Sequence, residues 1–307
     1  MQPTTHTPVS TQVMLSIIQR HRLQVRSFSL RPWVGGGSCV YQLEDTSVLK
    51  VPHDDPAPIT SIAIEAAAAV HAHAAGVRTP RLIAFDDSLD LLPVPYLVYE
   101  RVHGEPLPQI GRSPATVRRI WREVGGDLAR LHTRVGLDMS LRPLPKHEQS
   151  PDTDPRPWVE NLHRAGDLTD AEACWLGDVL DRLAPATLAP LSLCFCHGDV
   201  NAGNVVVGHR EPRTYAALLD WGGAGWADPA SDFSGIALEF VPSVLSGHRE
   251  IALLEDDDTA EVRVLWFYLR LALFGLNRNV TTESERARRI ERLLGDTGAF
   301  LHRAQLA

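Results

Sequence analysis

The chain has 307 residues, of which 44% are hydrophobic, and its formal net charge at pH 7 is −8. This length predicts a sizeable core in one large domain or two packed lobes. The negative charge argues against a nucleic-acid partner and suits a cationic small molecule or a metal ion. Apolar runs are too short for the roughly 20 residues that span a bilayer, and residues 1–10 lack a signal-peptide pattern, so we expect a cytoplasmic protein with no membrane partner.

The first third of the chain predicts strands with two helices. Residues 31–51 indicate strand, glycine turn, strand, tight turn and strand, because GGG and Glu44-Asp45 interrupt apolar segments. The Ala-rich residues 60–75 predict a helix that Gly76 ends. The other elements expected here are a short amphipathic helix over residues 11–22 and a strand over residues 96–102.

The rest of the chain predicts mainly helices. Ser113 and Pro114 suit the N-cap and first position of a helix whose apolar face continues to Leu131. Residues 136–157 contain five prolines and predict a long surface loop. Further helices are expected over residues 169–183, 231–240, 259–277 and 283–294. This order predicts an α+β fold of two lobes, an N-lobe of residues 1–102 and a C-lobe of residues 103–307.

The stretch CFCHGDVNAGNVVV, residues 194–207, places several polar side chains between two apolar strands. If its last three valines pair with residues 215–219 as a hairpin, Asn204 lies beside Asp220. With Asp199 on the preceding loop, these oxygens suit a hard cation such as Mg²⁺. Any one of these residues could equally be a turn residue, so the prediction depends on the whole set.

These segments resemble a known family. HGDVNAGN is similar to the HGDxxxxN catalytic loop of the aminoglycoside phosphotransferase and choline kinase-like enzymes, and LLDWGGAGWADPASDF, residues 218–233, resembles their metal-binding segment. The resemblance covers about residues 31–240, and its other landmarks are GGGSCVYQL, SVLKV, AAGVRTPRLIAF, YLVYERVHGEPL and GDLARLHT. It implies a bilobal protein kinase-like fold with an antiparallel-sheet N-lobe and a mainly helical C-lobe.

The same resemblance implies transfer of the γ-phosphoryl group of ATP or GTP to a hydroxyl of a small molecule. Asp199 would then accept or orient the hydroxyl proton, while Asn204 and Asp220 hold Mg²⁺. Lys50 would contact the nucleotide phosphates and pair with Glu65. The other nucleotide-binding residues that the resemblance implies are Gly36, Gly37 and Ser38 of the glycine turn and Tyr99, Glu100 and Arg101 of the hinge.

Several alternatives stay open at this point. The acceptor could be an aminoglycoside-type antibiotic or a choline-, homoserine- or sugar-type metabolite, and the protein a monomer or a homodimer. A nucleotide-binding module without turnover is the competing interpretation, although Lys50, Asp199, Asn204 and Asp220 are all present. A protein kinase is disfavoured, because Gly198 stands where protein kinases have Arg and there is no APE-like segment.

Other polar residues near the motif have structural interpretations. We expect His197 to hydrogen-bond nearby backbone, and Asp228 and Asp232 to cap and brace a helix start. Cys194 and Cys196 are two apart on a predicted strand and should face one side. That spacing is typical of neither a CxxC zinc site nor a redox pair, so they are interpreted as reduced thiols and no zinc is assigned.

Overall fold

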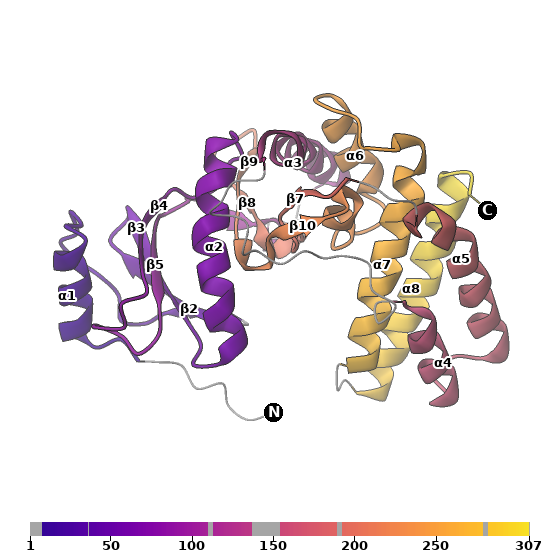
Figure 1. The fold of residues 1–307 in the computed structure, drawn as a ribbon, viewed down its shortest axis with the longest axis horizontal. Coiled ribbons are helices and arrows are strands. Elements are labelled where there is room, and N and C mark those ends of the chain that lie inside the picture. Colours follow the sequence, from indigo (N-terminus) through magenta and orange to yellow (C-terminus); the bar gives the residue numbers. More distant parts are fainter. Residues whose placement is uncertain are drawn as a thin grey trace.

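The computed structural model describes residues 8–35, 37–109, 113–136, 154–188, 192–278 and 282–306 (Figure 1). A five-stranded antiparallel sheet with two helices lies at one end of the molecule and a group of long helices at the other. Short strands and loops lie between them (Figure 1). No helix within these described residues is long and apolar enough to cross a bilayer.

The N-terminal sheet has the strand order β1-β2-β3-β5-β4. Its two helices lie on opposite faces (Figure 1). Met14 and Ile17 of α1 pack against one face, and Leu97 of β5 belongs to the larger core that includes α2. These elements are α1 (Thr11–Arg20), β1 (Trp33–Val34), β2 (Ser38–Leu43), β3 (Ser47–Pro52), α2 (Pro56–Ala74), β4 (Leu82–Asp86) and β5 (Tyr96–Glu100).

The glycine hairpin, the three strands of residues 31–51 and the strand that begins at Tyr96 are confirmed. Helix α2 begins at Pro56, earlier than predicted. Proline is tolerated there because the N–H groups of a first helical turn have no intrahelical partner. Gly76, at φ +84°, follows the end of this helix as expected.

Two small sheets carry the predicted catalytic region. β8 pairs antiparallel with β9 and with β6, and β7 pairs with β10. Val205 lies opposite Leu218, so the predicted hairpin is confirmed. The elements are β6 (Glu105–Pro106), the 3-10 turn η1 (Leu107–Gln109), β7 (Cys194–Cys196), η4 (Ala202–Asn204), β8 (Val205–Val207), β9 (Tyr215–Leu218), η5 (Trp221–Gly223), β10 (Gly225–Ala227) and η6 (Pro229–Phe233).

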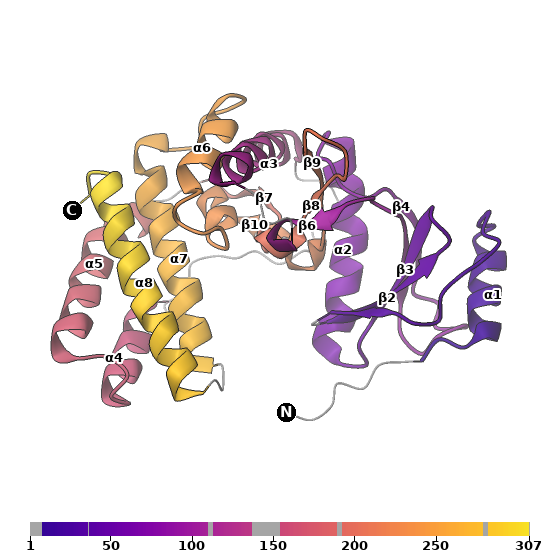
Figure 2. The same ribbon diagram turned by 180° about the vertical axis from the view of Figure 1, so that it is seen from behind.

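Long α-helices make up most of the rest of the C-terminal part that the structure describes, and α4, α5, α7 and α8 lie side by side at its far end (Figures 1 and 2). Ser113 caps α3 by accepting a hydrogen bond from the N–H of Thr116, as predicted. The helices are α3 (Pro114–Arg134), α4 (Arg156–Arg164), α5 (Asp170–Leu188), α6 (Val241–Arg249), α7 (Ala260–Arg278) and α8 (Glu283–Arg303), with η7 (Asp257–Thr259) before α7.

Three predictions in this part need correction. The helix expected over residues 231–240 is wrong: η6 ends at Phe233, and turns follow before α6. A β-carbon at Gly235 would approach the backbone oxygen of Val200 to 2.4 Å, so tertiary packing fixes this segment. The end of the loop predicted over residues 136–157 is wrong, because α4 begins at Arg156, and residues 137–153 of that prediction lie outside the described residues. Helix α8 continues well past residue 294.

Candidate active site

Asp199 lies exposed on the loop between β7 and β8. The side-chain amide of Asn201 donates to one of its carboxylate oxygens at 2.9 Å, and the amide of Asn204 donates to the other at 3.0 Å. Because both oxygens accept hydrogen bonds, the carboxylate is held in a fixed orientation. Both of these hydrogen bonds use side-chain nitrogens, so the side-chain oxygen of Asn204 is not engaged by Asp199 and can bind a cation.

His197 holds this loop in shape, as predicted. It is fully buried, its Nε2 donates to the backbone oxygen of Leu219 at 3.0 Å, and its Nδ1 accepts from the N–H of Asp199 at 3.2 Å. Its ring contacts Trp221, with 4.4 Å between ring centroids. Burial lowers the pKa of His197, so the ring is neutral. Both ring nitrogens are engaged with backbone, which gives His197 a positioning role.

The loop also lies against the segment that follows Asp220. A β-carbon on Gly198, at φ +80°, would stand 1.9 Å from the backbone oxygen of Gly223. Only glycine fits this approach and this left-handed backbone. The arginine of protein kinases has no room here, so the glycine allows the loop with Asp199 to approach the predicted metal-binding segment.

Asp220 lies directly after the β8–β9 hairpin, beside the end of the loop. The N–H of Leu219 donates to the backbone oxygen of Asn204 at 2.8 Å, so the two predicted metal ligands are held at the same strand end. Asp220 adopts a left-handed conformation at φ 68°, which Asp tolerates better than most residues, and its side chain is 52% exposed. Buried Trp221 anchors the following turn by donating to Thr79.

Lys50 of β3 links the sheet to this segment. Its Nζ lies 2.6 Å from a carboxylate oxygen of Glu65 on α2 and 3.0 Å from one of Asp220. Burial acts to lower the pKa of Lys50, but Glu65 and then Asp220 raise it overall, so the ammonium group stays charged. Burial, followed by the charge of Glu65, raises the pKa of nearby Tyr99. Lys50, Glu65 and Asp220 are therefore brought together.

The glycine turn and the hinge flank this centre. The N–H of Gly35 donates to the backbone oxygen of Ser38 at 2.8 Å, and the backbone oxygen of Gly37 accepts from His53 at 2.9 Å. Gly36 lies outside the described residues. At the end of β5, the N–H groups of Glu100 and Arg101 already donate to Arg81 and Thr46. These two donors are engaged within the sheet, so purine contacts there would need other backbone groups.

A buried polar network lies behind the loop. Asp232 accepts hydrogen bonds from the N–H groups of His197 and Gly198 at 2.9 and 2.7 Å, and from His132 Nε2 at 2.8 Å. His132 Nδ1 bonds His248 Nε2 at 3.2 Å, and His248 Nδ1 donates to the backbone oxygen of Ala252. The bracing role of Asp232 is confirmed. His132 and His248 have no signal in the sequence that predicts this role, because only long-range contacts bring them to the network.

Asp228 is the second bracing residue. It caps η6 by accepting from the N–H of Ala230 and pairs with the fully buried Arg263 of α7 at 2.6 Å. Its predicted capping role is confirmed, and the ion pair ties α7 to the segment behind the loop.

The oxygen atoms of Asp199, Asn204 and Asp220 are suitable ligands for a hard cation. Asp220 offers an exposed carboxylate at the same strand end as the amide oxygen of Asn204, and Asp199, which is hydrogen-bonded to Asn204, offers a second carboxylate. Mg²⁺ takes oxygen ligands of this kind, with further positions filled by water and phosphate. Asn204 and Asp220 would hold it, while Lys50 supplies a fixed positive charge for phosphate oxygens.

The model of the phosphotransferase enzyme family, APH, matches residues 29–267 of this chain. No curated protein sequence matches the chain.

Solved structures match nearly the whole chain at low sequence identity. The GDP complex of wild-type aminoglycoside 2'-phosphotransferase-IIIa is 14% identical, with a TM-score of 0.68 over 94% of this chain and 99% of that one. Spectinomycin phosphotransferase with ADP and spectinomycin is 15% identical, with a TM-score of 0.60 over 95% and 99%. The streptomycin–ATP ternary complex of APH(2")-IIa is 16% identical, with a TM-score of 0.54 over 95% and 96%. These likenesses show a bilobal kinase-like α+β fold.

Proposed function

Since the chain belongs to the phosphotransferase enzyme family, we propose that it transfers the γ-phosphoryl group of ATP or GTP to a hydroxyl group of a small molecule. The nucleotide would lie between an N-lobe of residues 1–102 and a C-lobe of residues 103–307. Mg²⁺ would neutralise charge on the nucleotide phosphates when bound.

The observation that carries this proposal is the position of Lys50. Its ammonium group bridges Glu65 on α2 and Asp220 beside the catalytic loop, at 2.6 and 3.0 Å. A largely buried cation held between two carboxylates of different elements is a fixed charge for phosphate. Asp220, one of these carboxylates, is half exposed and has a second oxygen, not bonded to Lys50, for a metal ion. A merely structural lysine at a strand edge would not need both partners.

Asp199 then receives the acceptor. A substrate hydroxyl placed against its carboxylate donates a hydrogen bond to it, which aligns the oxygen for attack on the γ-phosphorus. As the new P–O bond forms and the bond to the leaving nucleotide breaks, the hydroxyl proton passes to Asp199. Asn201 and Asn204 keep the carboxylate in place during this step.

Two observations favour one class of acceptor among those that the family could phosphorylate. Solved structures of similar fold hold spectinomycin or streptomycin beside a nucleotide, and the net charge of −8 suits a cationic acceptor. We therefore propose an amine-bearing, hydroxylated acceptor of the aminoglycoside type ahead of choline-, homoserine- or sugar-type metabolites.

The test is transfer of labelled γ-phosphate from ATP and from GTP, with Mg²⁺, to a panel of aminoglycosides, choline, homoserine and sugars. Wild type is compared with Asp199→Ala, and with Glu160→Ala on α4 as a surface control. We expect a phosphorylated product from wild type and the control, and a loss of about 10²–10⁴ in rate for Asp199→Ala.

Nucleotide binding without any phosphorylated product would favour the non-catalytic binding module. Absence of nucleotide binding in the presence of Mg²⁺ would contradict the proposal as a whole. Equal rates in wild type and Asp199→Ala would contradict the role of Asp199.

A further inference from the structure

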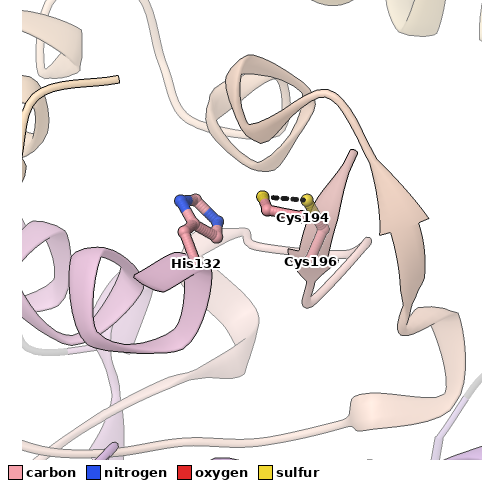
Figure 3. Close-up of side chains that lie close together, drawn as sticks. All are labelled: His132, Cys194 and Cys196. Carbon is pink, nitrogen blue, oxygen red and sulfur yellow. Dashed lines mark hydrogen bonds between the residues drawn. The ribbon is translucent and has the colours of Figure 1, made fainter. Parts of the chain in front are cut away.

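Three soft or borderline metal ligands converge behind the catalytic loop. His132 lies near the C-terminal end of α3, and Cys194 and Cys196 lie on β7, with their side chains turned toward one another (Figure 3). One ring nitrogen of His132 and the two sulfur atoms all lie within 4.8 Å of one another. We infer that these residues form a binding site for a thiophilic, tetrahedral metal ion of the Zn²⁺ class, distinct from the Mg²⁺ site.

The distance between the sulfur atoms fits this inference. Residues two apart on a strand face the same side, and the Sγ atoms of Cys194 and Cys196 are 3.6 Å apart. Two thiolates bound to one tetrahedral zinc ion, at about 2.3 Å each, are about 3.8 Å apart. A disulfide would need about 2.05 Å. The pair is therefore spaced for a shared ion, and both cysteines are free.

His132 supplies the third ligand. Both of its ring nitrogens have partners, Asp232 at 2.8 Å and His248 at 3.2 Å. Coordination exchanges one of these hydrogen bonds for the metal and keeps the other. Metal-binding histidines are commonly oriented in this way, with the second nitrogen bonded to a carboxylate or another acceptor. A water molecule or a neighbouring side chain completes the tetrahedron.

The surroundings favour a cation. The carboxylates of Asp232 and Asp228 are close enough to act electrostatically on Cys194. As the metal binds, each thiol releases its proton to solvent and becomes a thiolate, and the coordinating ring nitrogen of His132 also loses its proton, so two thiolates balance a divalent charge. Cys196 is buried, whereas Cys194 is partly exposed and provides the route for the ion and the protons. Thiolate ligands select Zn²⁺ or Cu⁺ over Mg²⁺.

The site can be tested directly with Co²⁺ as the probe. The full chain is purified with a reductant, stripped with a chelator and titrated with Co²⁺ without oxygen. We expect a thiolate-to-cobalt charge-transfer band and the visible bands of a tetrahedral site, saturating at one equivalent and abolished by Zn²⁺. Cys194→Ser should lower the charge-transfer band to half or less, because only the Cys196 thiolate remains, while Cys174→Ser, which changes the exposed cysteine of α5, should keep the full band.

The Mg²⁺ site is separated from this test by its chemistry. Co²⁺ bound at Asn204 and Asp220 would have oxygen ligands and no thiolate band, so Asp220→Asn should leave the band unchanged. Failure of the metal inference and failure of the proposed phosphotransfer are therefore distinguishable.

Three outcomes would overturn the inference. One is the absence of a thiolate band in wild type, and another is a band of undiminished intensity in Cys194→Ser. The third is loss of two free thiols without metal, which would mean that a disulfide forms instead. Zinc-edge X-ray absorption of the wild-type protein tests His132 without a variant: two sulfur ligands and at least one nitrogen are expected, and sulfur ligation without nitrogen would exclude His132.

Discussion

The loop from His197 to Asn204 has two faces that differ in exposure and in what satisfies their polar groups. On the front, Asp199 is exposed, Asp220 beside it is half exposed, and both are held by neighbouring side chains. On the back, the side chains of His132 and Asp232 are almost fully buried, and Asp232 accepts hydrogen bonds from His132 and from the N–H groups of His197 and Gly198.

This difference in exposure separates residues that can bind ligands, on the front, from residues that stabilise the loop, on the back. Asp199 and Asp220 can exchange a hydrogen bond within the protein for one to a phosphate, a metal ion or a hydroxyl, because both side chains are accessible to solvent. On the back, Asp232 cannot give up its partners without leaving the N–H groups of His197 and Gly198 unsatisfied. Substitutions on the front should therefore change rate, and substitutions on the back should change stability.

The largest effect on stability is expected for Asp232→Ala. This change leaves the N–H groups of His197 and Gly198 and one nitrogen of His132 without their acceptor. Breaking a buried charged network of this kind typically costs about 3–5 kcal/mol of unfolding free energy. Urea unfolding measures it, with Asp181→Ala, a 70% exposed carboxylate, as the control. A loss below about 1 kcal/mol would remove the distinction between the two faces.

The front is tested with Asp220→Asn, because Asn tolerates the same left-handed backbone. Loss of this carboxylate should lower kcat/KM by about 10²–10³ through weaker charge stabilisation at the phosphates. The free energy of unfolding should change by less than about 0.5 kcal/mol, since the side chain is 52% exposed. Steady-state kinetics and urea unfolding of the same samples measure both quantities. An unchanged rate would argue against a metal role for Asp220.

Two glycines with the same backbone conformation test the close approach of the loop to Gly223. Gly198 and Gly166 have φ of +80° and +79°, but a β-carbon would meet Gly223 at Gly198 and nothing within 4 Å at Gly166. Each alanine variant carries the left-handed strain of about 1–2 kcal/mol. Gly198→Ala should lose about 1–3 kcal/mol more from overpacking, and phosphotransfer activity with it. Equal losses in thermal or urea unfolding would show that the close approach is unimportant.

The smallest effect concerns pH. Burial, and then the charge of His132, lower the pKa of His248 to about 4. The unfolded chain binds a proton at His248 near pH 6.5 while the folded chain does not, so unfolding is favoured as pH falls from about 6.5 to 4. Between pH 7 and pH 5 this amounts to about 2 kcal/mol.

His132 works in the opposite direction. Burial opposes its charge, but Cys194 and then Asp232 raise its pKa overall, so its contribution to stability is present at low pH and lost as pH rises above 6.5. Comparing wild type with His248→Gln isolates the His248 contribution. Urea unfolding at pH 7 and pH 5 should show a smaller loss for the variant. An equal loss in both proteins would contradict the linkage.

Much of the front face could be predicted from the sequence, because the patterns that indicate it lie within a few consecutive residues. HGDVNAGN is eight consecutive residues, and the hairpin that brings Asn204 beside Asp220 follows from two short apolar strands and a turn. Ser113 capping α3 and Gly76 ending α2 depend on residues within one helical turn. The pairing of Lys50 with Glu65 needed the family resemblance as well, because one lysine and one helix glutamate have no distinctive local pattern.

Tertiary structure alone decided the back face. His132 lies 100 residues from Asp232 and 116 from His248 in the sequence, and neither spacing predicts a contact. The same holds for Arg263 and Asp228, and for the meeting of His132 with the two cysteines of β7. A CxC pair was correctly predicted to face one side, but the sequence contains no sign of its third partner. Capping, turn chemistry and strand alternation act over a few residues and can be read along the chain. Contacts between α3, α6, β7 and η6 exist only because burial of their apolar faces packs these elements together.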